Sequence, residues 1–294
     1  MNPSRLRSFL ALHLAVLLFG AAGVFGKYIA LSALSLVFGR TLFAALCLLP
    51  LVQWPALRQS IKWSGSMVSG ALLALHWLTF FASLHYAAVA FGLMGFATYP
   101  IFVATLEPWL FKQPRQRRDI YVAVMVVLGL IVMVSDAKWQ DGSLQAIGMG
   151  ALSGLSFAFL TLTNRNQGKT ASSIQIAFIQ NSIACLLLLP MAIFEHELIK
   201  ISLHTWILLA VLGVVFTALS HSMFAFSLQS LSASLVSITA ALEPVYGMLL
   251  AYLVLDEVVS VRAFSGAAIV ILTTSVASCL HRDSAVDTGF DLQV

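Results

Sequence analysis

Residues 233–255 read ASLVSITAALEPVYGMLLAYLVL, and Glu243 is the one acidic or basic residue among them. A helix needs about 20 apolar residues to cross the hydrocarbon core of a bilayer, because each residue adds only about 1.5 Å. A chain in lipid must also satisfy its backbone groups internally, which a helix does. The stretch therefore predicts a membrane-spanning helix with one charge near its middle.

Further stretches of similar length and hydrophobicity lie along the chain. Of the 294 residues, 60% are hydrophobic and only 10% are charged, and the mean hydropathy is +0.94. Soluble domains take about a quarter of their residues from Asp, Glu, Lys and Arg, so this composition excludes a soluble enzyme, a secreted disulfide scaffold and a disordered chain. We expect an all-α membrane protein whose ten transmembrane helices cover about 9–30, 33–53, 64–84, 87–111, 120–135, 145–163, 174–194, 205–227, 233–255 and 261–280.

Basic residues are divided unequally between the two sides that these spans define. Lys and Arg are retained on the cytoplasmic side, so the side richer in them is inside. With the N-terminus inside, the inner segments carry Arg5, Arg7, Arg58, Lys62, Lys112, Arg115, Arg117, Arg118, Arg165, Lys169 and Arg282. The outer loops carry Lys27, Lys138, Lys200 and Arg262. Both termini are therefore predicted to be cytoplasmic, and the net charge of +4 indicates topology and no nucleic-acid partner.

The two halves of the chain resemble each other. Ala44–Leu51 reads AALCLLPL and Ala184–Met191 reads ACLLLLPM, at an offset of 140 residues. Later positions match at an offset of 144, for example Phe80 with Phe224 and Pro100 with Pro244. Five spans in each half, an odd number, mean that the second half enters the membrane from the opposite side. The sequence predicts two inverted-topology repeats, at 9–135 and 145–280, followed by a polar cytoplasmic tail at 281–294.

A family resemblance rests on two of these stretches. Ala241–Leu272 is similar to the closing repeat of EamA-type members of the drug/metabolite transporter superfamily, and Thr98–Phe111 resembles the equivalent place in their first repeat. The resemblance implies a carrier of small organic solutes in the bacterial inner membrane, with a central cavity lined by the first, third and fourth helices and their repeat mates. The first half departs from the pattern, because Lys112-Gln113 stands where Asp256-Glu257 stands in the second, and Tyr99 replaces Glu243.

Ionisable residues within spans give the first candidate site residues, because charge is expensive in lipid. Glu243 is followed by Pro244, which removes a backbone N–H and favours a kink. Three roles are open for Glu243: substrate contact, proton acceptor in a coupled cycle, or structural partner of a neighbouring helix. Arg40 either snorkels outward or pairs with an acid such as Glu243. Glu107, followed by Pro108, lies near the cytoplasmic end of its span and is predicted to be a gating or structural residue, as is Pro100.

Aromatic and histidine residues form the second candidate cluster. On the third span, His76 and Phe80 share one helical face, with Trp77 on the neighbouring one. The eighth span likewise carries a histidine, His221, close to an aromatic residue, Phe224. A polar group between rings is typical of a cavity for a planar or apolar-tailed solute, although rings also face lipid and histidines are also buried as structural hydrogen-bonding groups. Together with Tyr99, these residues are predicted to bind substrate or to take part in coupling.

No metal, cofactor or catalytic motif is found in the sequence. The three cysteines lack metal-ligand spacing, and the nucleophile motifs of hydrolases are missing, so we expect no enzyme, metal or cofactor. The leading hypothesis is a secondary carrier that works by alternating access, with an amino acid or a planar vitamin such as riboflavin as substrate. Its partners are the solute and the bilayer, while protons, a counter-substrate and a homodimer are left open. The alternative is a non-transporting membrane sensor or assembly subunit with the same fold.

Overall fold

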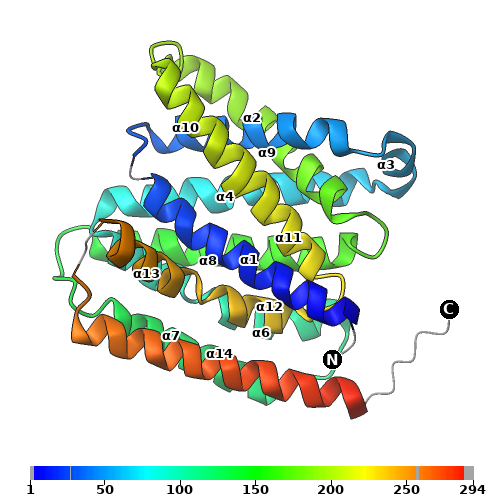
Figure 1. The fold of residues 1–294 in the computed structure, drawn as a ribbon, viewed down its shortest axis with the longest axis vertical. Coiled ribbons are helices and arrows are strands. Elements are labelled where there is room, and N and C mark those ends of the chain that lie inside the picture. The colour runs from blue at the N-terminus through cyan, green and yellow to red at the C-terminus, as the bar shows by residue number, and fades with distance from the viewer. Residues whose placement is uncertain (1–2, 27, 256–257, 288–294) are drawn as a thin grey trace.

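The computed structural model describes residues 3–26, 28–255 and 258–287, and this part of the chain is all-helical without strands (Figure 1). Lys27, Asp256, Glu257 and residues 288–294 of the predicted tail lie outside the described residues. The helices are α1 (Pro3–Gly26), α2 (Ala33–Leu48), η1 (Leu49–Leu51), α3 (Trp54–Ser60), α4 (Trp63–Tyr86), α5 (Val89–Phe96), α6 (Tyr99–Phe111), α7 (Arg117–Met133), α8 (Ser143–Gln167), α9 (Ser173–Glu195), α10 (Leu203–Gly213), η2 (Val214–Leu219), α11 (Ser220–Ser227), α12 (Ala233–Ala240), α13 (Glu243–Leu255) and α14 (Val261–Asp287).

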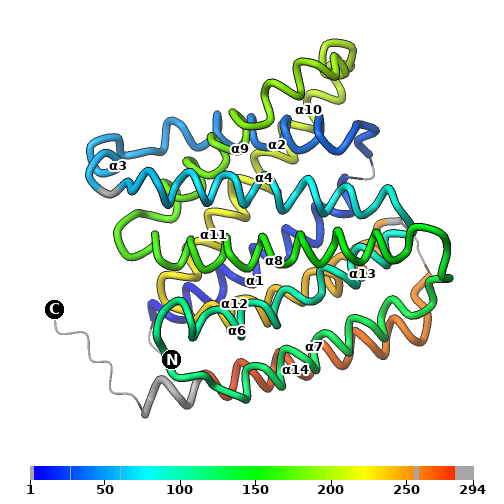
Figure 2. The backbone as a smooth tube through the Cα atoms, turned by 180° about the vertical axis from the view of Figure 1, so that it is seen from behind, coloured from blue at the N-terminus to red at the C-terminus, as the bar shows by residue number. Residues whose placement is uncertain are grey.

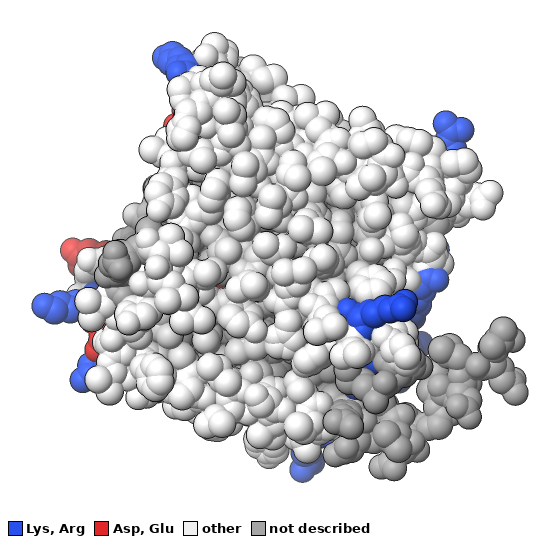
Figure 3. All heavy atoms as spheres, in the orientation of Figure 1, with Lys and Arg blue, Asp and Glu red and all other residues white. Residues whose placement is uncertain are grey.

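Nine helical segments of the described residues, each 19 to 25 residues long, are long and apolar enough to cross a membrane. The predicted fifth span corresponds to α7, which has 17 residues and is shorter than those nine. Figure 3 shows that charged side chains on one face lie toward its ends and rim, with a broad uncharged area between them. An uncharged belt of this kind suits contact with lipid.

Two predicted spans are each broken in the middle into two helices, whereas the sequence predicted only a kink at Pro244. The chain leaves the helix between α5 and α6, and again between α12 and α13. Proline is tolerated in the first turn of a helix but not in its interior, and Pro100 and Pro244 each stand second in the helix after the break. Adding 144 to the bounds of α5 and α6 gives the bounds of α12 and α13. The helix break and the helix ends of the fourth and ninth predicted spans are therefore related by the same 144-residue offset.

Helices from the two halves interleave. α4 packs along α8, α2 along α9, and α1 along α11 and α13. α7 and α14 lie side by side at one edge of the bundle (Figure 2). Small residues allow the closest approaches: a Cβ at Gly20 would lie 2.7 Å from the Glu243 carbonyl oxygen, and one at Gly150 only 2.2 Å from that of Gly92.

The eighth predicted span contains a π-helical segment, η2, between α10 and α11. The hydroxyl of Thr217 donates to the carbonyl oxygen of Leu212, five residues back, at 2.9 Å. A π-helical turn leaves carbonyl groups with less regular partners than an α-helix does, and such turns occur often at functional sites. The corresponding third span is continuous as α4, so the two halves differ here.

Candidate functional site

A cavity of about 530 Å³ lies in the middle of the bundle. Its walls come from helices of both halves, chiefly α1, α4, α5 and α13. Six of the predicted site residues border it: Arg40, His76, Trp77, Phe80, His221 and Glu243. Pro244, predicted to have a structural role, borders it as well. The structure thus brings together the charged and aromatic candidates that lie about 200 residues apart in the sequence.

Arg40 on α2 is held by the π-helical segment. Its Nε donates to the Thr217 hydroxyl at 3.0 Å, and Nη2 donates to the Phe216 carbonyl oxygen at 3.3 Å. The guanidinium carbon lies 4.1 Å from the ring centroid of Trp77, which is cation–π geometry. The side chain is buried rather than snorkelling outward, and among the described residues it forms no direct ion pair with Glu243. Arginine has five N–H donors, and among the described residues no hydrogen bond from Nη1 is found.

Glu243 is the first residue of α13, directly after the helix break. Its carboxylate borders the cavity, and no hydrogen bond to it is found among the described residues. The backbone N–H groups at a helix start favour a negative charge there, which offsets part of the cost of placing a carboxylate in the bundle. Glu243 and Arg40 therefore place an acidic and a basic side chain on one cavity, and no ion pair between them is found among the described residues.

Aromatic rings form the other walls of the cavity. The His76 ring stacks on Phe157 at 4.5 Å between centroids with an interplanar angle of 26°, and Trp77 meets His221 edge-on at 5.1 Å. Trp77 and His221 correspond at the 144-residue offset, so the two repeats touch through equivalent positions. Phe157 was not among the predicted residues. It lies on α8, the sixth predicted span, which is the repeat mate of the first, and the family resemblance implies that this helix lines the cavity. The resemblance could therefore have pointed to Phe157.

Tyr99 and Phe224 lie behind the cavity wall rather than on it. The Tyr99 hydroxyl is 2.9 Å from the Thr161 hydroxyl oxygen, and its ring packs against Phe96 and Phe157. Phe224 is fully buried, and its ring centroid lies 5.4 Å from that of Phe157. Both residues therefore support rings of the wall, and Pro100, next to Tyr99, is also buried.

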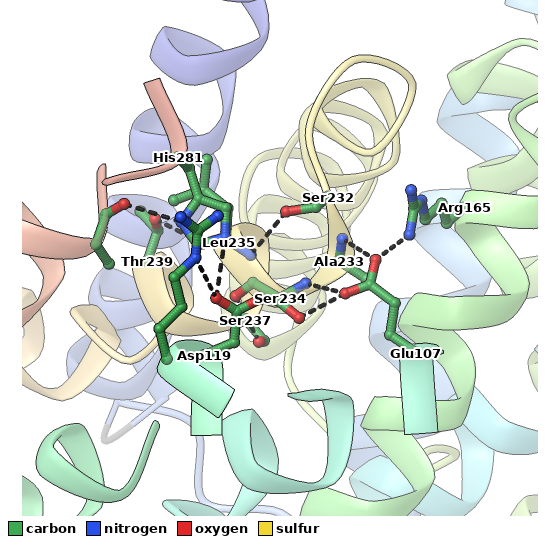
Figure 4. A network of polar contacts seen from close by, with 12 residues as sticks. Glu107, Asp119, Arg165, Ser232, Ala233, Ser234, Leu235, Ser237, Thr239 and His281 are labelled. Carbon is green, nitrogen blue, oxygen red and sulfur yellow. Dashed lines mark hydrogen bonds and ion pairs between the residues drawn. The ribbon is translucent and has the colours of Figure 1, made fainter. Parts of the chain in front are cut away.

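Glu107 lies on α6, outside the cavity, in a network that Figure 4 shows. Its carboxylate accepts hydrogen bonds from the backbone N–H groups of Ala233 at 2.8 Å and Ser234 at 2.7 Å, and from the Ser234 hydroxyl at 2.5 Å. It also forms an ion pair with Arg165 of α8. We call these four residues the Glu107 network. The carboxylate thus caps the first turn of α12.

The cavity extends from the middle of the bundle to one end, which we call the open end. Gly26, Leu84, Val89 and Ala251 line it there, at the last turns of α1, α4 and α13 and the start of α5. Val89 is 53% exposed. The Glu107 network lies toward the other end, the closed end, and among the described residues none from α6 or α12 lines the cavity. Pro108, next to Glu107, is inside α6 and away from the cavity.

Comparison with known proteins agrees with the resemblance. Residues 6–135 and again residues 144–279 match the EamA-like transporter family. An uncharacterized transporter of Bacillus subtilis, YwfM, is 25% identical over 287 residues, which cover 92% of this chain and 93% of the relative. An uncharacterized transporter of Archaeoglobus fulgidus is 24% identical over 245 residues, covering 82% and 86%. One protein of known crystal structure shares the fold, with a TM-score of 0.78 at 14% identity and coverage of 96% and 99%.

These findings define a multi-pass membrane transporter. Because the family matches span most of the chain, the protein belongs to the EamA-like transporter family, within the drug/metabolite transporter superfamily. Membership of the family implies a small solute and a lipid bilayer as partners. A transporter is not normally an enzyme. The predicted class is thus confirmed.

Proposed function

We propose that the protein is a secondary carrier that moves a small organic metabolite across the cytoplasmic membrane by alternating access. The observation that carries this proposal is the central cavity, which joins Arg40, Glu243 and a ring of aromatic side chains. Its volume of about 530 Å³ is in the usual range for sites of small organic ligands. An amino acid or a planar vitamin-like solute such as riboflavin fits this chemistry best.

Each part of such a solute has a counterpart in the cavity. The free N–H donors of Arg40 suit a carboxylate or another oxygen acceptor. Glu243 suits an ammonium or a hydrogen-bond donor. Trp77, Phe80 and Phe157 suit a planar or apolar part, because aromatic surfaces stack on flat groups. A strongly anionic solute would need more cations than the single Arg40 that borders the cavity among the described residues.

We further propose that the chain forms ten spans in two inverted repeats, residues 9–135 and 145–280, with α7 as the tenth span. The shared 144-residue offset of the helix breaks supports this proposal, as does the pairing of α7 with α14. In this arrangement the two repeats rock about the cavity, and the Glu107 network is the gate that keeps the cytoplasmic end closed. Both termini then lie in the cytoplasm of a cell whose inner membrane holds the protein.

Transport by purified protein in proteoliposomes tests this function. Labelled amino acids and riboflavin are offered with and without a pH gradient, in uptake and in counterflow. We expect saturable movement of at least one solute, a loss of about tenfold or more in kcat/KM for Arg40→Gln, and loss of any pH-gradient dependence in Glu243→Gln.

Tyr99→Phe is the matched control, since it removes a buried hydroxyl behind the wall. It should keep most activity. If no solute moves under any gradient or exchange condition, the carrier proposal fails and a non-transporting role gains support. If pH dependence is unchanged in Glu243→Gln, then Glu243 is not the coupling acid.

A further inference from the structure

Ser153 of α8 and His76 of α4 share a reciprocal pair of hydrogen bonds across the two repeats. The Ser153 hydroxyl donates to the backbone carbonyl oxygen of His76 at 3.0 Å. The His76 Nδ1 lies 2.8 Å from the same hydroxyl oxygen and 3.3 Å from the Ser153 carbonyl oxygen. Both residues are buried, and Ser153 has no exposed surface.

These contacts bear on which ring nitrogen of His76 carries the proton. A serine hydroxyl has one hydrogen, and when that hydrogen is donated to the His76 carbonyl oxygen, the hydroxyl oxygen can only accept from Nδ1. The second neighbour of Nδ1, a carbonyl oxygen, is also an acceptor. With two acceptors facing it, Nδ1 is favoured as the N–H donor. A neutral imidazole has a single N–H, so its Nε2 is a bare acceptor.

The Nε2 atom is available to a solute. His76 borders the cavity, and among the described residues no hydrogen bond to its Nε2 is found. The ring is fixed in place by the stack on Phe157 and by Trp77 and Phe96 at 6.4 and 5.5 Å between centroids. An acceptor held rigidly among rings gains most from a ligand that donates to it, because few alternative partners are present.

We propose that Ser153 is a positioning residue that fixes the Nδ1–H tautomer of His76, so that Nε2 accepts a hydrogen bond from an N–H or O–H group of the transported solute. The second half of this statement rests on the proposed carrier function. It narrows the substrate class to solutes that carry such a donor on the part that reaches His76.

Nitrogen-15 NMR of the full-length protein with labelled histidine tests the tautomer without any transport. The chain has seven histidines, so the His76 signals are assigned by their loss in His76→Phe. We expect a protonated Nδ1 and an unprotonated Nε2 at neutral pH. Ser153→Ala should move the population toward the Nε2–H tautomer, and Ser153→Thr, which keeps a hydroxyl, should restore the original pattern.

Ser156→Ala is the matched control, because Ser156 is equally buried on α8 and its hydroxyl bonds to the Ser153 carbonyl oxygen without contacting His76. Its spectrum should equal that of the parent. An Nε2–H tautomer or an imidazolium in the parent protein at neutral pH would overturn the proposal, whatever the transport assays show.

The solute half is tested with L-tryptophan and riboflavin, which both carry N–H or O–H donors. A solute that is transported should shift the Nε2 signal of His76 on saturation, and Ser153→Ala should raise its KM about three- to tenfold with little change in kcat. An unchanged Nε2 signal with a transported solute overturns this half. Absence of transport for every solute counts against the carrier function and leaves the tautomer result to stand on its own.

Discussion

The two ends of the cavity are built from corresponding helices but carry different side chains. At the closed end, Glu107 of α6 caps the start of α12 at Ala233. The positions 144 residues away are Ala251 of α13 and Val89 at the start of α5, and both line the open end of the cavity. An acid thus joins two helices at one end, whereas an alanine and a valine line the cavity at the other.

This difference teaches that backbone symmetry and energetic symmetry are separate properties. An alternating-access carrier has one form that is open at each end of the cavity. If its two halves were identical, each form would repeat the contacts of the other with the halves exchanged, and the two forms would have the same free energy. Glu107 has no acidic counterpart at the 144-residue offset, so in the proposed cycle its hydrogen bonds and its ion pair with Arg165 would exist in only one of the two forms. We therefore expect the Glu107 network to favour the form that is closed at its own end.

The largest expected effect comes from Glu107→Ala. It leaves Arg165 and the first N–H groups of α12 without their acceptor, which should cost about 3 kcal/mol in the closed-end form. We expect a lower melting temperature in detergent and opening of the closed end. The measurement uses single reporter cysteines in a background without Cys47, Cys185 and Cys279: Met248→Cys, at the cavity, and Ala104→Cys, its buried equivalent at the 144-residue offset.

In the parent background, the cysteine at 248 should react quickly with a water-soluble maleimide and the one at 104 slowly. Glu107→Ala should reverse this order. Glu107→Gln keeps an acceptor oxygen without the charge, so its labelling rates should lie between those of the parent and those of Glu107→Ala. If both reporters keep their parental rates in Glu107→Ala, the network does not hold the closed end.

A smaller effect is expected from placing the missing acid at the open end. Ala251→Glu puts a carboxylate where Glu107 stands at the other end, near the start of α5 but without an arginine. An acid at a helix start contributes about 1 kcal/mol, so labelling of the cysteine at 248 should fall several-fold. Ala251→Gln has similar size without charge and serves as the control. Equal labelling in the two variants would mean that the open end lacks the geometry to use an acid.

The smallest effect concerns the ion pair at the rim of the open end. Asp136 after α7 accepts hydrogen bonds from Ser260 and Arg262 of the opposite repeat, and these bonds hold the pKa of Asp136 below its usual value. A depressed carboxyl pKa stabilises the fold above the pKa of the unfolded chain, and this contribution is lost as the pH falls through the folded value.

Thermal unfolding in detergent should therefore show a slightly steeper loss of stability between about pH 5 and pH 3 for the parent than for Asp136→Asn. The balance between the reporters at 104 and 248 should not change, because the pair joins α7 and α14 without crossing the cavity. A reversal of the reporters in Asp136→Asn would show that this rim contact also acts as a gate.

The transporter class and the all-helical fold could be predicted from the sequence because hydrophobic length and repeat offsets are local or additive signals. The cavity position of Glu243 followed from the cost of a carboxylate in lipid. The hydrogen bonds of Arg40 could not be predicted. Its acceptors lie in a π-helical turn, and the hydrophobic periodicity of the eighth span does not indicate such a turn. The partner of Glu107 is 126 residues away in the other half, and only folding brings the two together.

The helix breaks show an intermediate case. Pro244 indicated a kink, but proline alone does not distinguish a bend from two separate helices. The structure shows separate helices at both Pro100 and Pro244. Ser153 gave no signal at all, since a serine in a small-residue stretch is typical of helix packing.

The π-helical segment Val214–Leu219 also sets the rotational register of everything after it. Each residue turns an α-helix by about 100°, so deleting one residue here to restore regular α-helix would rotate α11 by roughly that angle relative to α10. His221 would then leave the cavity wall and a different side chain would take its place. The inserted turn is thus a one-residue adjustment of helix phase, and it decides which face of the eighth span lines the cavity.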